Sequence, residues 1–387
     1  MKQILLLSWI IISLCSCSKQ FPVGIVVENG SIASFDFNDC LSSDYYETAD
    51  ILDSMKIILL ETNNLSLIGN PYQVILTDKR IYIRDDYQEF GLIIFDSNGK
   101  YLKRIERGNG PGEFARIVKI GFDQYRQELL VLTNPLLIKY DMDGNYLSTI
   151  QLDYPADNIV GCTEDCYLLS KVYGHQCYGY DGLDDYSLLV SDKDGNLEQM
   201  FMPYNNTVIP GHIGSYTNED KIVVGVSHCD SMFYFQNDSL YYFRKIDITS
   251  KKLDINQFKS FNDYIKDYLS KEEVSELCFD GRFFETISHV VMPLLSGQTT
   301  YEIFMDKHTR KVCSGRYQRY YSDETIAIST PIGVSDGWFY ALGSPADYKH
   351  GSLTNPKYLS KEDVAKLESL SPDDNPYIMF YKLKRFE

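Results

Sequence analysis

A short pattern recurs in this chain at a spacing of 45 residues, and this repeat limits the folds that the chain can adopt. Residues 95–105 read FDSNGKYLKRI and residues 140–150 read YDMDGNYLSTI, with aromatic, Asp, Gly, Tyr, Leu and Ile residues at matching positions. A period of this size is typical of solenoids and propellers, in which each repeat is one supersecondary unit. Between the two copies lies a glycine-rich stretch, 107–114, which reads RGNGPGEF.

Each copy of the pattern ends a group of four short runs that are rich in β-branched, aromatic and leucine residues. The first group is 72–76, 80–84, 92–96 and 101–105, and the second is 114–122, 129–133, 137–141 and 146–152. Asn98-Gly99 and Asp143-Gly144 stand at the last turn of each group, and such pairs are strong hairpin signals. The chain is therefore predicted to be all-β and built of four-stranded antiparallel units, which suits its 31 Tyr and 20 Phe.

The number of strands predicts how the array closes. Later groups begin near residues 158, 221, 283 and 325, but the last of them lacks one strand. The run 56–62, KIILLET, stands alone before the first group, and pairing with the C-terminal strand 377–383 would complete the last unit. A radial array has to close because open strand edges invite aggregation. Seven units of about 45 residues would fit the chain, but the strand count favours a six-bladed β-propeller.

One part of the chain departs from the strand pattern. Between residues 259 and 277 the apolar side chains recur at helical spacing, and Ser270 with Glu273 matches a capping box. This pattern predicts a small helical insertion, 250–282, between two of the later blades. A second short helix is expected at 361–369, inside a long loop.

The N-terminal residues predict export. Lys2 precedes an apolar run, 4–14, that is shorter than a membrane span. Residues 14–17, LCSC, resemble a bacterial lipobox, in which the last cysteine is lipidated and becomes the first residue. We expect 1–16 to be a lipoprotein signal peptide, with a plain signal peptide as the alternative. Cys17 would then carry acyl chains, each buried methylene contributing about 0.8 kcal/mol. Residues 17–55 would be a tether and leading segment, and 56–387 one propeller domain.

Charge and cysteine spacing exclude some classes of function. The net charge of −17 repels phosphate backbones, so we expect no nucleic-acid partner. The cysteine spacing fits no zinc site. Cys162 and Cys166, with Cys177, could form one disulfide in an oxidising compartment, and buried unpaired thiols are the alternative.

Three further patterns suggest ligand sites without completing their motifs. The stretch RGNGPGEF lacks the Gly-Lys-Ser/Thr of a phosphate loop and precedes a strand. It is therefore predicted to be a crossing between blades, with Phe114 packed between them. The turns at Asp141 and Asp192 lack the distal Glu of an EF-hand. The six histidines, among them His228 beside Cys229 and Asp230, complete no metal-binding motif. We therefore predict no catalytic residue, metal or cofactor.

Four stretches together resemble a family of bacterial six-bladed β-propeller lipoproteins whose blades are similar to NHL repeats. They are LLET at 59–62, FxxNGK at 95–100, RGxGPGEF at 107–114 and the closing stretch 375–384. The resemblance covers nearly the whole mature chain. It implies a protein of the bacterial cell envelope, lipid-anchored to the outer membrane, but it implies no defined activity, because fold does not determine function.

The function predicted from these features is a binding or scaffolding module for a protein, peptide or glycan. The alternative is a hydrolase or lyase with a metal-assisted site at the central channel, and the missing catalytic motif favours the binding module. Loops on a rigid scaffold often carry binding residues. The candidate binding-face residues are Arg107, Asn109, Glu113, Tyr173, His175, Tyr178 and Tyr180.

Overall fold

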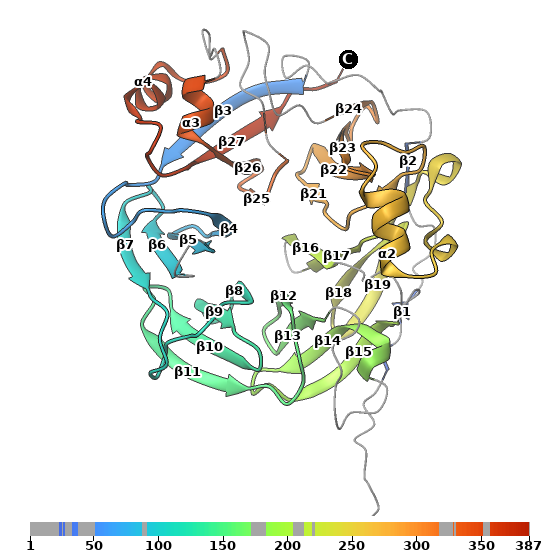
Figure 1. Cartoon of the computed structure of the whole chain (residues 1–387), viewed down its shortest axis with the longest axis horizontal. Helices are drawn as coiled ribbons and strands as arrows, with labels where there is room; N and C mark the ends of the chain where they lie inside the picture. Colours follow the sequence, from blue (N-terminus) through green and yellow to red (C-terminus); the bar gives the residue numbers. More distant parts are fainter. Residues whose placement is uncertain are drawn as a thin grey trace, which may run out of the picture.

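The computed structural model describes residues 23–24, 26–27, 33–37, 51–86, 91–171, 183–203, 213–218, 221–316, 328, 330–350 and 357–386. These residues form six antiparallel sheets arranged in a ring around a common centre (Figure 1). Each sheet is one blade, with an innermost strand near the centre and an outermost strand at the rim. The predicted six-bladed propeller is confirmed.

Blades I to III are consecutive four-stranded meanders. Blade I contains β4 (Pro71–Leu76), β5 (Arg80–Asp85), β6 (Gly91–Asp96) and β7 (Tyr101–Ile105). Blade II contains β8 (Lys119–Asp123), β9 (Glu128–Leu132), β10 (Leu136–Asp141) and β11 (Tyr146–Gln151). Blade III contains β12 (Asn158–Cys162), β13 (Cys166–Ser170), a 3-10 turn (Leu183–Asp185), β14 (Tyr186–Asp192) and β15 (Leu197–Pro203). The inner strand of blade II begins later than the predicted residue 114, because the chain before Lys119 is used for the crossing from blade I.

Blades IV to VI carry additions. Blade IV contains β16 (Ile213–Asn218), β17 (Lys221–Val226), β18 (Ser231–Gln236) and β19 (Ser239–Asp247), with β1 (Val26–Val27) and β2 (Ala33–Asp36) in parallel beside β19. Blade V contains β20 (Cys278–Phe279), β21 (Phe284–Glu285), β22 (His289–Ser296), β23 (Thr299–Asp306) and β24 (Val312–Arg316). Blade VI contains β25 (Gly333–Ser335), β26 (Trp338–Gly343), β27 (Tyr377–Leu383) and β3 (Leu52–Leu59). Most of the strand expected at 325–332 lies outside the described residues.

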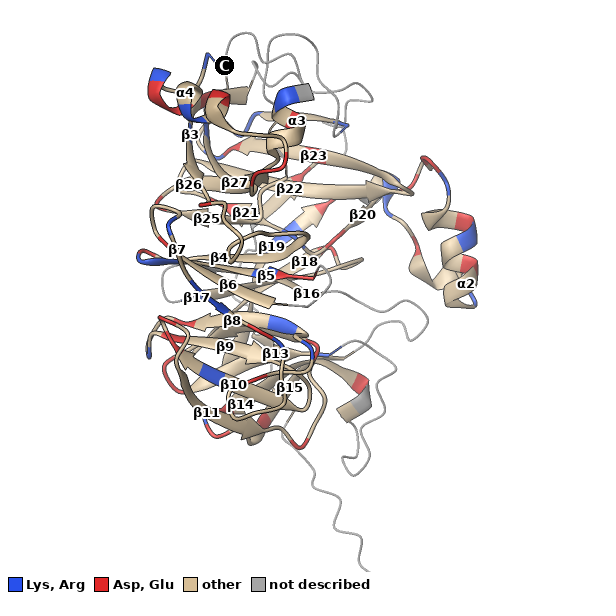
Figure 2. Ribbon diagram, turned by 60° about the vertical axis from the view of Figure 1, so that its left-hand side comes forward, with Lys and Arg blue, Asp and Glu red and all other residues tan. Residues whose placement is uncertain are grey.

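The helices lie outside the blades. Between β26 and β27 are α3 (Pro345–His350) and α4 (Lys361–Ser369), the second as predicted. The insertion between blades IV and V holds 3-10 turns (Thr249–Lys251 and Ile255–Gln257), α2 (Phe261–Tyr264) and a π-helical turn (Ile265–Leu269). Figure 2 shows α2 projecting from the ring.

The capping box expected at Ser270 is wrong. Ser270 stands at the C-terminal end of the π-helical turn, and its hydroxyl donates to the carbonyl of Lys266 at 2.7 Å. The N-cap is Ser260, whose side chain accepts a hydrogen bond from the amide of Asp263 at 3.1 Å. Ser270 and Glu273 have the residue types of a capping box, but they follow a helix instead of starting one. The chain after them returns to the ring to form β20.

The ring closes through blade VI, which combines β3 from the N-terminal region with strands from the C-terminal region. β3 pairs antiparallel with β27, from Leu59 opposite Tyr377 to Leu52 opposite Leu383. The pairing predicted for the strand 56–62 is confirmed, but the strand itself begins and ends earlier. After Leu59 the chain turns toward blade I, so residues 60–62 form the corner that joins the two blades.

The glycine of each repeated hairpin lets one blade approach the preceding blade closely. Gly99, Gly144 and Gly195 all have positive φ, at 85°, 76° and 91°. A Cβ on Gly99 would overlap the carbonyl oxygen of Leu59 in blade VI, and one on Gly144 would lie 2.5 Å from Ile94 in blade I. Glycine therefore serves both the turn and the packing between blades.

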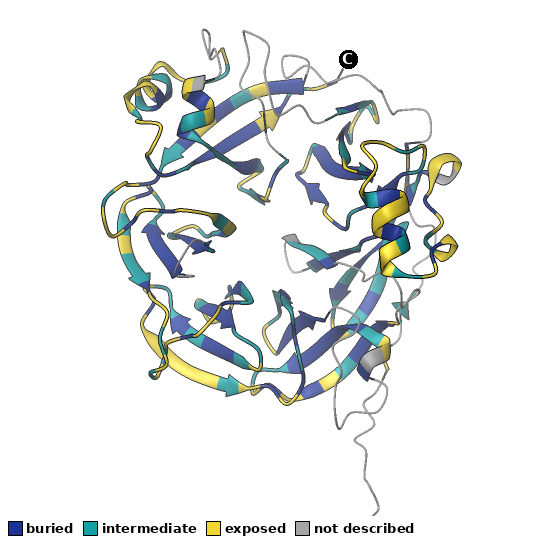
Figure 3. Ribbon diagram, in the orientation of Figure 1, coloured by how far each residue is buried: buried dark blue, intermediate teal, exposed yellow. Residues whose placement is uncertain are grey.

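The apolar core consists of clusters between neighbouring blades. The cluster between blades I and II includes Tyr82, Phe114 and Tyr140. Buried side chains run through every blade, whereas the outermost strand β11 is largely exposed (Figure 3). Burial of apolar surface stabilises a fold by about 25 cal/mol per Å². These clusters therefore hold adjacent blades together.

We expect Gly99→Ala to destabilise the protein far more than Gly337→Ala. Both glycines have positive φ, at 85° and 73°, so alanine costs about 1–2 kcal/mol of backbone strain at either position. Nothing lies within 4 Å of the Cβ position at Gly337, whereas at Gly99 the new methyl would overlap the main chain of Leu59. The total loss at Gly99 should reach about 3 kcal/mol or more in urea unfolding. Equal losses of unfolding free energy in the two variants would show that the close contact between Gly99 and Leu59 does not limit stability.

Candidate functional site

The glycine-rich stretch forms the crossing from blade I to blade II. The amide of Gly108 donates to the carbonyl of Phe114 at 3.0 Å, and the Glu113 carboxylate accepts from the amide of Gly110 at 2.7 Å. The ring of Phe114 is 2% exposed and packs between the two blades. The predicted crossing, with Phe114 between the blades, is confirmed.

The structure places only some of the predicted binding-face residues. Arg107, Asn109 and Glu113 are exposed on this crossing. The other residues singled out from the sequence lie outside the described part of the chain, and they are Cys17, Tyr173, His175, Tyr178 and Tyr180. Binding or lipidation at any of these positions stays a prediction.

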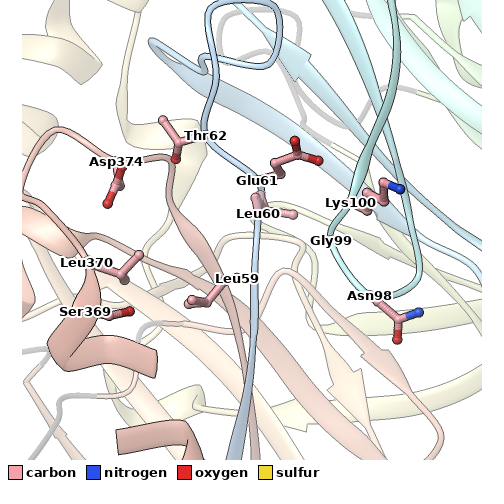
Figure 4. Close-up of a pocket in the computed structure, with 10 residues that line it drawn as sticks. All are labelled: Leu59, Leu60, Glu61, Thr62, Asn98, Gly99, Lys100, Ser369, Leu370 and Asp374. Carbon is pink, nitrogen blue, oxygen red and sulfur yellow. The ribbon is translucent and has the colours of Figure 1, made fainter. Parts of the chain in front are cut away.

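A groove of about 470 Å³ lies where the ring closes (Figure 4). Its walls are the corner 59–62, the hairpin 98–100 and the segment after α4, including Asp374. The amide of Glu61 donates to the carbonyl of Gly99 at 2.8 Å, and the Glu61 carboxylate accepts from the amide of Tyr101 at 2.9 Å. Much of the polar lining of the groove therefore holds the ring closed, whereas the side chain of Lys100 is exposed.

The cluster His228, Cys229 and Asp230 fixes the helical insertion to blade IV. Nε2 of His228 lies 3.0 Å from the hydroxyl of Tyr264, and the Asp230 carboxylate lies 3.0 Å from the ammonium of Lys252. Burial lowers the pKa of His228 to about 4 and raises the pKa of the Cys229 thiol. His228 and Asp230 thus bond to the insertion, whereas Cys229 packs against the apolar cluster between blades III and IV.

The disulfide considered from the sequence is not formed between Cys162 and Cys166. Both are free and buried. Cys162 belongs to the apolar cluster between blades II and III, whereas Cys166 belongs to the cluster between blades III and IV. Because the two side chains lie on opposite faces of blade III, they do not meet. Cys177 lies outside the described residues.

The acidic turns are held by their own main chain. The Asp141 carboxylate accepts from the amides of Asp143 and Asn145 at 2.9 and 2.8 Å, and the side-chain amide of Asn145 donates to it at 2.8 Å. The turn at Asp192 has the same arrangement. Within the described residues, no three His, Cys, Asp or Glu side chains are placed to hold a metal ion.

A polar cluster lies where the innermost strands of blades I and II meet. The side chain of Gln73 fixes β4 to β8 by donating to the carbonyl of Ile120 at 2.7 Å and accepting from its amide at 2.9 Å. Arg84 is 4% exposed and donates to the carbonyl of Val118. Its guanidinium also donates to both oxygens of Asp86, at 2.7 and 2.8 Å.

Tyr72 completes this inner-strand cluster, which we define as Tyr72, Arg84 and Asp86. Tyr72 sits at a bulge of β4, and its side chain is 61% exposed. The guanidinium carbon of Arg84 lies 4.2 Å from the centre of its ring. Lys119 pairs with Leu132 and lies on the face of blade II that meets blade III. It is half-buried, and no residue that the structure describes forms an ion pair or hydrogen bond with its ammonium. Burial, and then the charge of Arg84, lower its pKa below 10.5.

Sequence reasoning did not single out this cluster. Its residues come from different parts of blade I, and Arg84 bonds to the main chain of Val118 before blade II. No motif spacing links them, and the bond from Arg84 depends on the packing of blade I against blade II. The only local signal is an aromatic residue beside Pro71 at the start of a strand.

We expect acid to destabilise the protein through His228. The pKa of about 4 in the folded state lies below the usual 6.5, so between these values the unfolded chain binds more protons, and stability falls as pH falls. Relative to His228→Asn, which removes the titration and tolerates the positive φ of 64°, the wild type should lose roughly 2–3 kcal/mol from pH 6.5 to 4. Parallel pH profiles in urea unfolding would contradict this expectation.

A protein of known structure shares this fold. A Bacteroides fragilis protein described as exported has a TM-score of 0.68 and 16% identity, and the match covers 92% of this chain and 100% of that one. A Bacteroides caccae protein of unknown function has a TM-score of 0.39 and 12% identity over 69% of this chain and 94% of that one. The likeness to the Bacteroides fragilis protein, at this identity, shows the fold alone. No curated protein matches the sequence.

A family match spans most of the chain. The sequence profile described as "Domain of unknown function (DUF4934)" matches residues 33–382. This range reaches all six blades, including the closing strand β3 and the helical insertion, and leaves out only β1 and the last residue of β27 among the strands. The chain therefore belongs to the DUF4934 family.

Proposed function

We propose that this protein is an exported, lipid-anchored propeller that binds or scaffolds a ligand at the cell envelope. The observation that carries the proposal is the attachment of residues 23–24, 26–27 and 33–37, here called the strap, to the rim of the ring. The likeness to a protein described as exported supports the same compartment. None of the helices among the described residues is long and apolar enough to cross a membrane.

The strap first meets the ring at blade III. Val23 forms a parallel bridge with Met200 of β15, and the amide of Gly24 donates to the carbonyl of Met200 at 2.9 Å. A Cβ on Gly24 would overlap the ring of Phe201. Only glycine allows this close approach of the strap to the blade.

The strap then covers the outer edge of blade IV. β1 pairs in parallel with β19 at Leu240 and Tyr241, and β2 pairs with it at residues 244–247. The guanidinium of Arg244 lies 5.0 Å from the ring centre of Phe35, and Phe37 is fully buried. The strap thus occupies a strand edge that would otherwise be open to other chains.

The short distance along the chain between the predicted lipid and the strap limits where the ring can sit. Six residues lead from Cys17 to Val23, and six residues span at most about 20 Å. Acyl chains on Cys17 would therefore hold the rim of blades III and IV near the bilayer surface. A rigid ring held in this way suits the binding or scaffolding of a protein, peptide or glycan at the envelope.

The anchor is tested by Cys17→Ala, with Cys15→Ala as the matched control. We expect Cys17→Ala to abolish incorporation of a labelled fatty acid and to move the protein from the membrane fraction to the soluble fraction. Cys15→Ala should change neither result. Incorporation that persists in Cys17→Ala, or a wild type already in the soluble fraction, would contradict the anchor.

The binding role is tested separately by chemical crosslinking of the wild type in native envelopes. We expect a protein or glycan to co-purify with the crosslinked ring. A Gly24→Val variant should weaken attachment of the strap and so reduce the amount recovered, because the ring is then held less closely to the membrane. Recovery of the ring alone, at every crosslinker length, would count against the binding role.

A further inference from the structure

We propose that the outer corner between blades VI and I is a docking surface for a partner protein that presents apolar side chains next to a carboxylate. The surface, here called the leucine corner, consists of Leu65, Leu67, Leu102 and Lys100. The proposal deepens the binding function proposed above and rests on it, since it selects a protein among the ligand classes and names the surface that receives it.

The leucine corner exposes three large apolar side chains. Leu65, Leu67 and Leu102 are 65%, 52% and 42% exposed. They gather around Arg104, whose guanidinium donates to the carbonyls of Leu65 and Leu67 at 3.1 and 2.5 Å, and Leu102 stands two residues before Arg104 on β7. Single exposed apolar side chains are normal on a protein surface, whereas a group of neighbouring ones marks an interaction site.

The loop that carries Leu65 and Leu67 is fixed by hydrogen bonds. Ser66, between the two leucines, is fully buried. The side-chain amide of Asn375 donates to the carbonyl of Ser66 at 2.8 Å, and its oxygen accepts from the amide of Ile68 at 2.7 Å. Groups that are fixed before a partner arrives lose little conformational entropy on binding it. The exposed leucines are therefore already arranged for a partner.

Lys100 supplies a cation at the edge of the leucines. It lies in the wall of the closing groove, two residues before Leu102, and its side chain is exposed (Figure 4). No residue that the structure describes forms an ion pair or hydrogen bond with its ammonium. The Glu61 and Asp374 carboxylates of the same groove each accept from a main-chain amide, at 2.9 and 2.7 Å. A carboxylate of a partner would therefore meet an available cation beside an apolar surface.

The chemistry of the leucine corner favours a protein over a glycan. Leucine side chains offer no hydrogen bond to a sugar hydroxyl, and most polar groups of the groove already hold the ring closed. Protein interfaces combine an apolar centre with a polar rim, which is the arrangement of the three leucines bordered by Lys100. A second copy of this chain is disfavoured, because each copy carries a net charge of −17.

The leucine corner lies across the ring from the strap. β7 belongs to blade I and β1 pairs with blade IV, and these blades are three apart in a ring of six (Figure 1). A ring whose rim at blades III and IV is held near the bilayer would present the leucine corner on the side away from the membrane. A partner protein can reach the surface there.

The proposal is tested first by photocrosslinking from single positions in the native envelope. The photoreactive residue p-benzoylphenylalanine replaces Leu65 or Leu67. In the matched control it replaces Leu147, which corresponds to Leu102 in the repeat and is 48% exposed on blade II. We expect one discrete protein adduct from the Leu65 and Leu67 positions and none from the Leu147 position. Mass spectrometry of the adduct should identify a segment that contains apolar residues and an Asp or Glu.

The captured protein is then purified, and its binding to the ring is measured by calorimetry. The double variant Leu65→Ser/Leu67→Ser and the single variant Lys100→Glu should each bind at least about tenfold more weakly than the wild type. Leu147→Ser should leave binding unchanged. Added salt should weaken binding of the wild type, because it screens the contact of Lys100 with the carboxylate. Since the changed side chains are exposed, all variants should keep the melting temperature of the wild type.

Several outcomes would overturn the proposal. They are no adduct from the Leu65 and Leu67 positions, an equally strong adduct from the Leu147 position, an adduct with a second copy, a lipid or a glycan, and unchanged binding in the double variant or in Lys100→Glu. A lower melting temperature with unchanged binding would assign the leucines to the fold. An adduct from the Leu147 position alone would move the proposed binding role to another part of the ring, whereas recovery of the ring alone by chemical crosslinking would remove that role itself.

Discussion

The pairing of β3 with β27 is the interaction on which the rest of the structure depends. In the other five blades the antiparallel strands come from one continuous stretch of chain, with β1 and β2 added to the edge of blade IV, but blade VI takes its outermost strand from residues 52–59 and its other three from the C-terminal region. The side chain of Asn375, just before β27, reinforces the pairing by donating to the carbonyls of Glu61 and Ser66, both at 2.8 Å. Without this pairing blade VI would present an open edge, and every neighbouring cluster would lose one wall.

The repeated hairpin makes the same contact between blades at the closing junction as it does elsewhere in the ring. In each of blades I to III, the glycine of the last hairpin packs against the outer part of the preceding blade. At the closing seam the preceding blade is blade VI, and the hairpin of blade I meets β3 in the same way. The strand from the N-terminal region therefore replaces a normal outer strand without a special contact. The closing groove is a by-product of this junction, since its polar groups mostly hold the seam.

Polar groups at the centre behave differently from those at the seam. At the junction of blades I and II, Gln73 and Arg84 bond to main chain across the gap between the blades, whereas Lys119 bonds to nothing that the structure describes. The bonds from Gln73 and Arg84 fix the innermost strands of blades I and II to each other.

Much of the fold was determined by the sequence itself. The recurrence at 45 residues gives the blades, the Asn98-Gly99 and Asp143-Gly144 turns give the hairpins, and the missing strand of the last group gives the closure. These features are local or depend on a strand count, so they can be read along the chain. The parallel pairing of β1 and β2 with β19 was not predicted, because short strands in a weakly patterned segment are defined by the edge that receives them. The disulfide considered for Cys162 and Cys166 fails for a related reason, since the two faces of a blade separate neighbours in sequence.

The candidate site was decided only by the tertiary structure. Tyr72, Arg84 and Asp86 carry no shared motif, and Arg84 reaches the carbonyl of Val118 only because one blade packs on the next. The sequence draws attention instead to the glycine-rich stretch, whose glycines and Phe114 serve the crossing between the same two blades. Local turn chemistry and strand patterning therefore fix the architecture. The meeting of charged and aromatic side chains depends on the angle and spacing between blades, which no single stretch of sequence encodes.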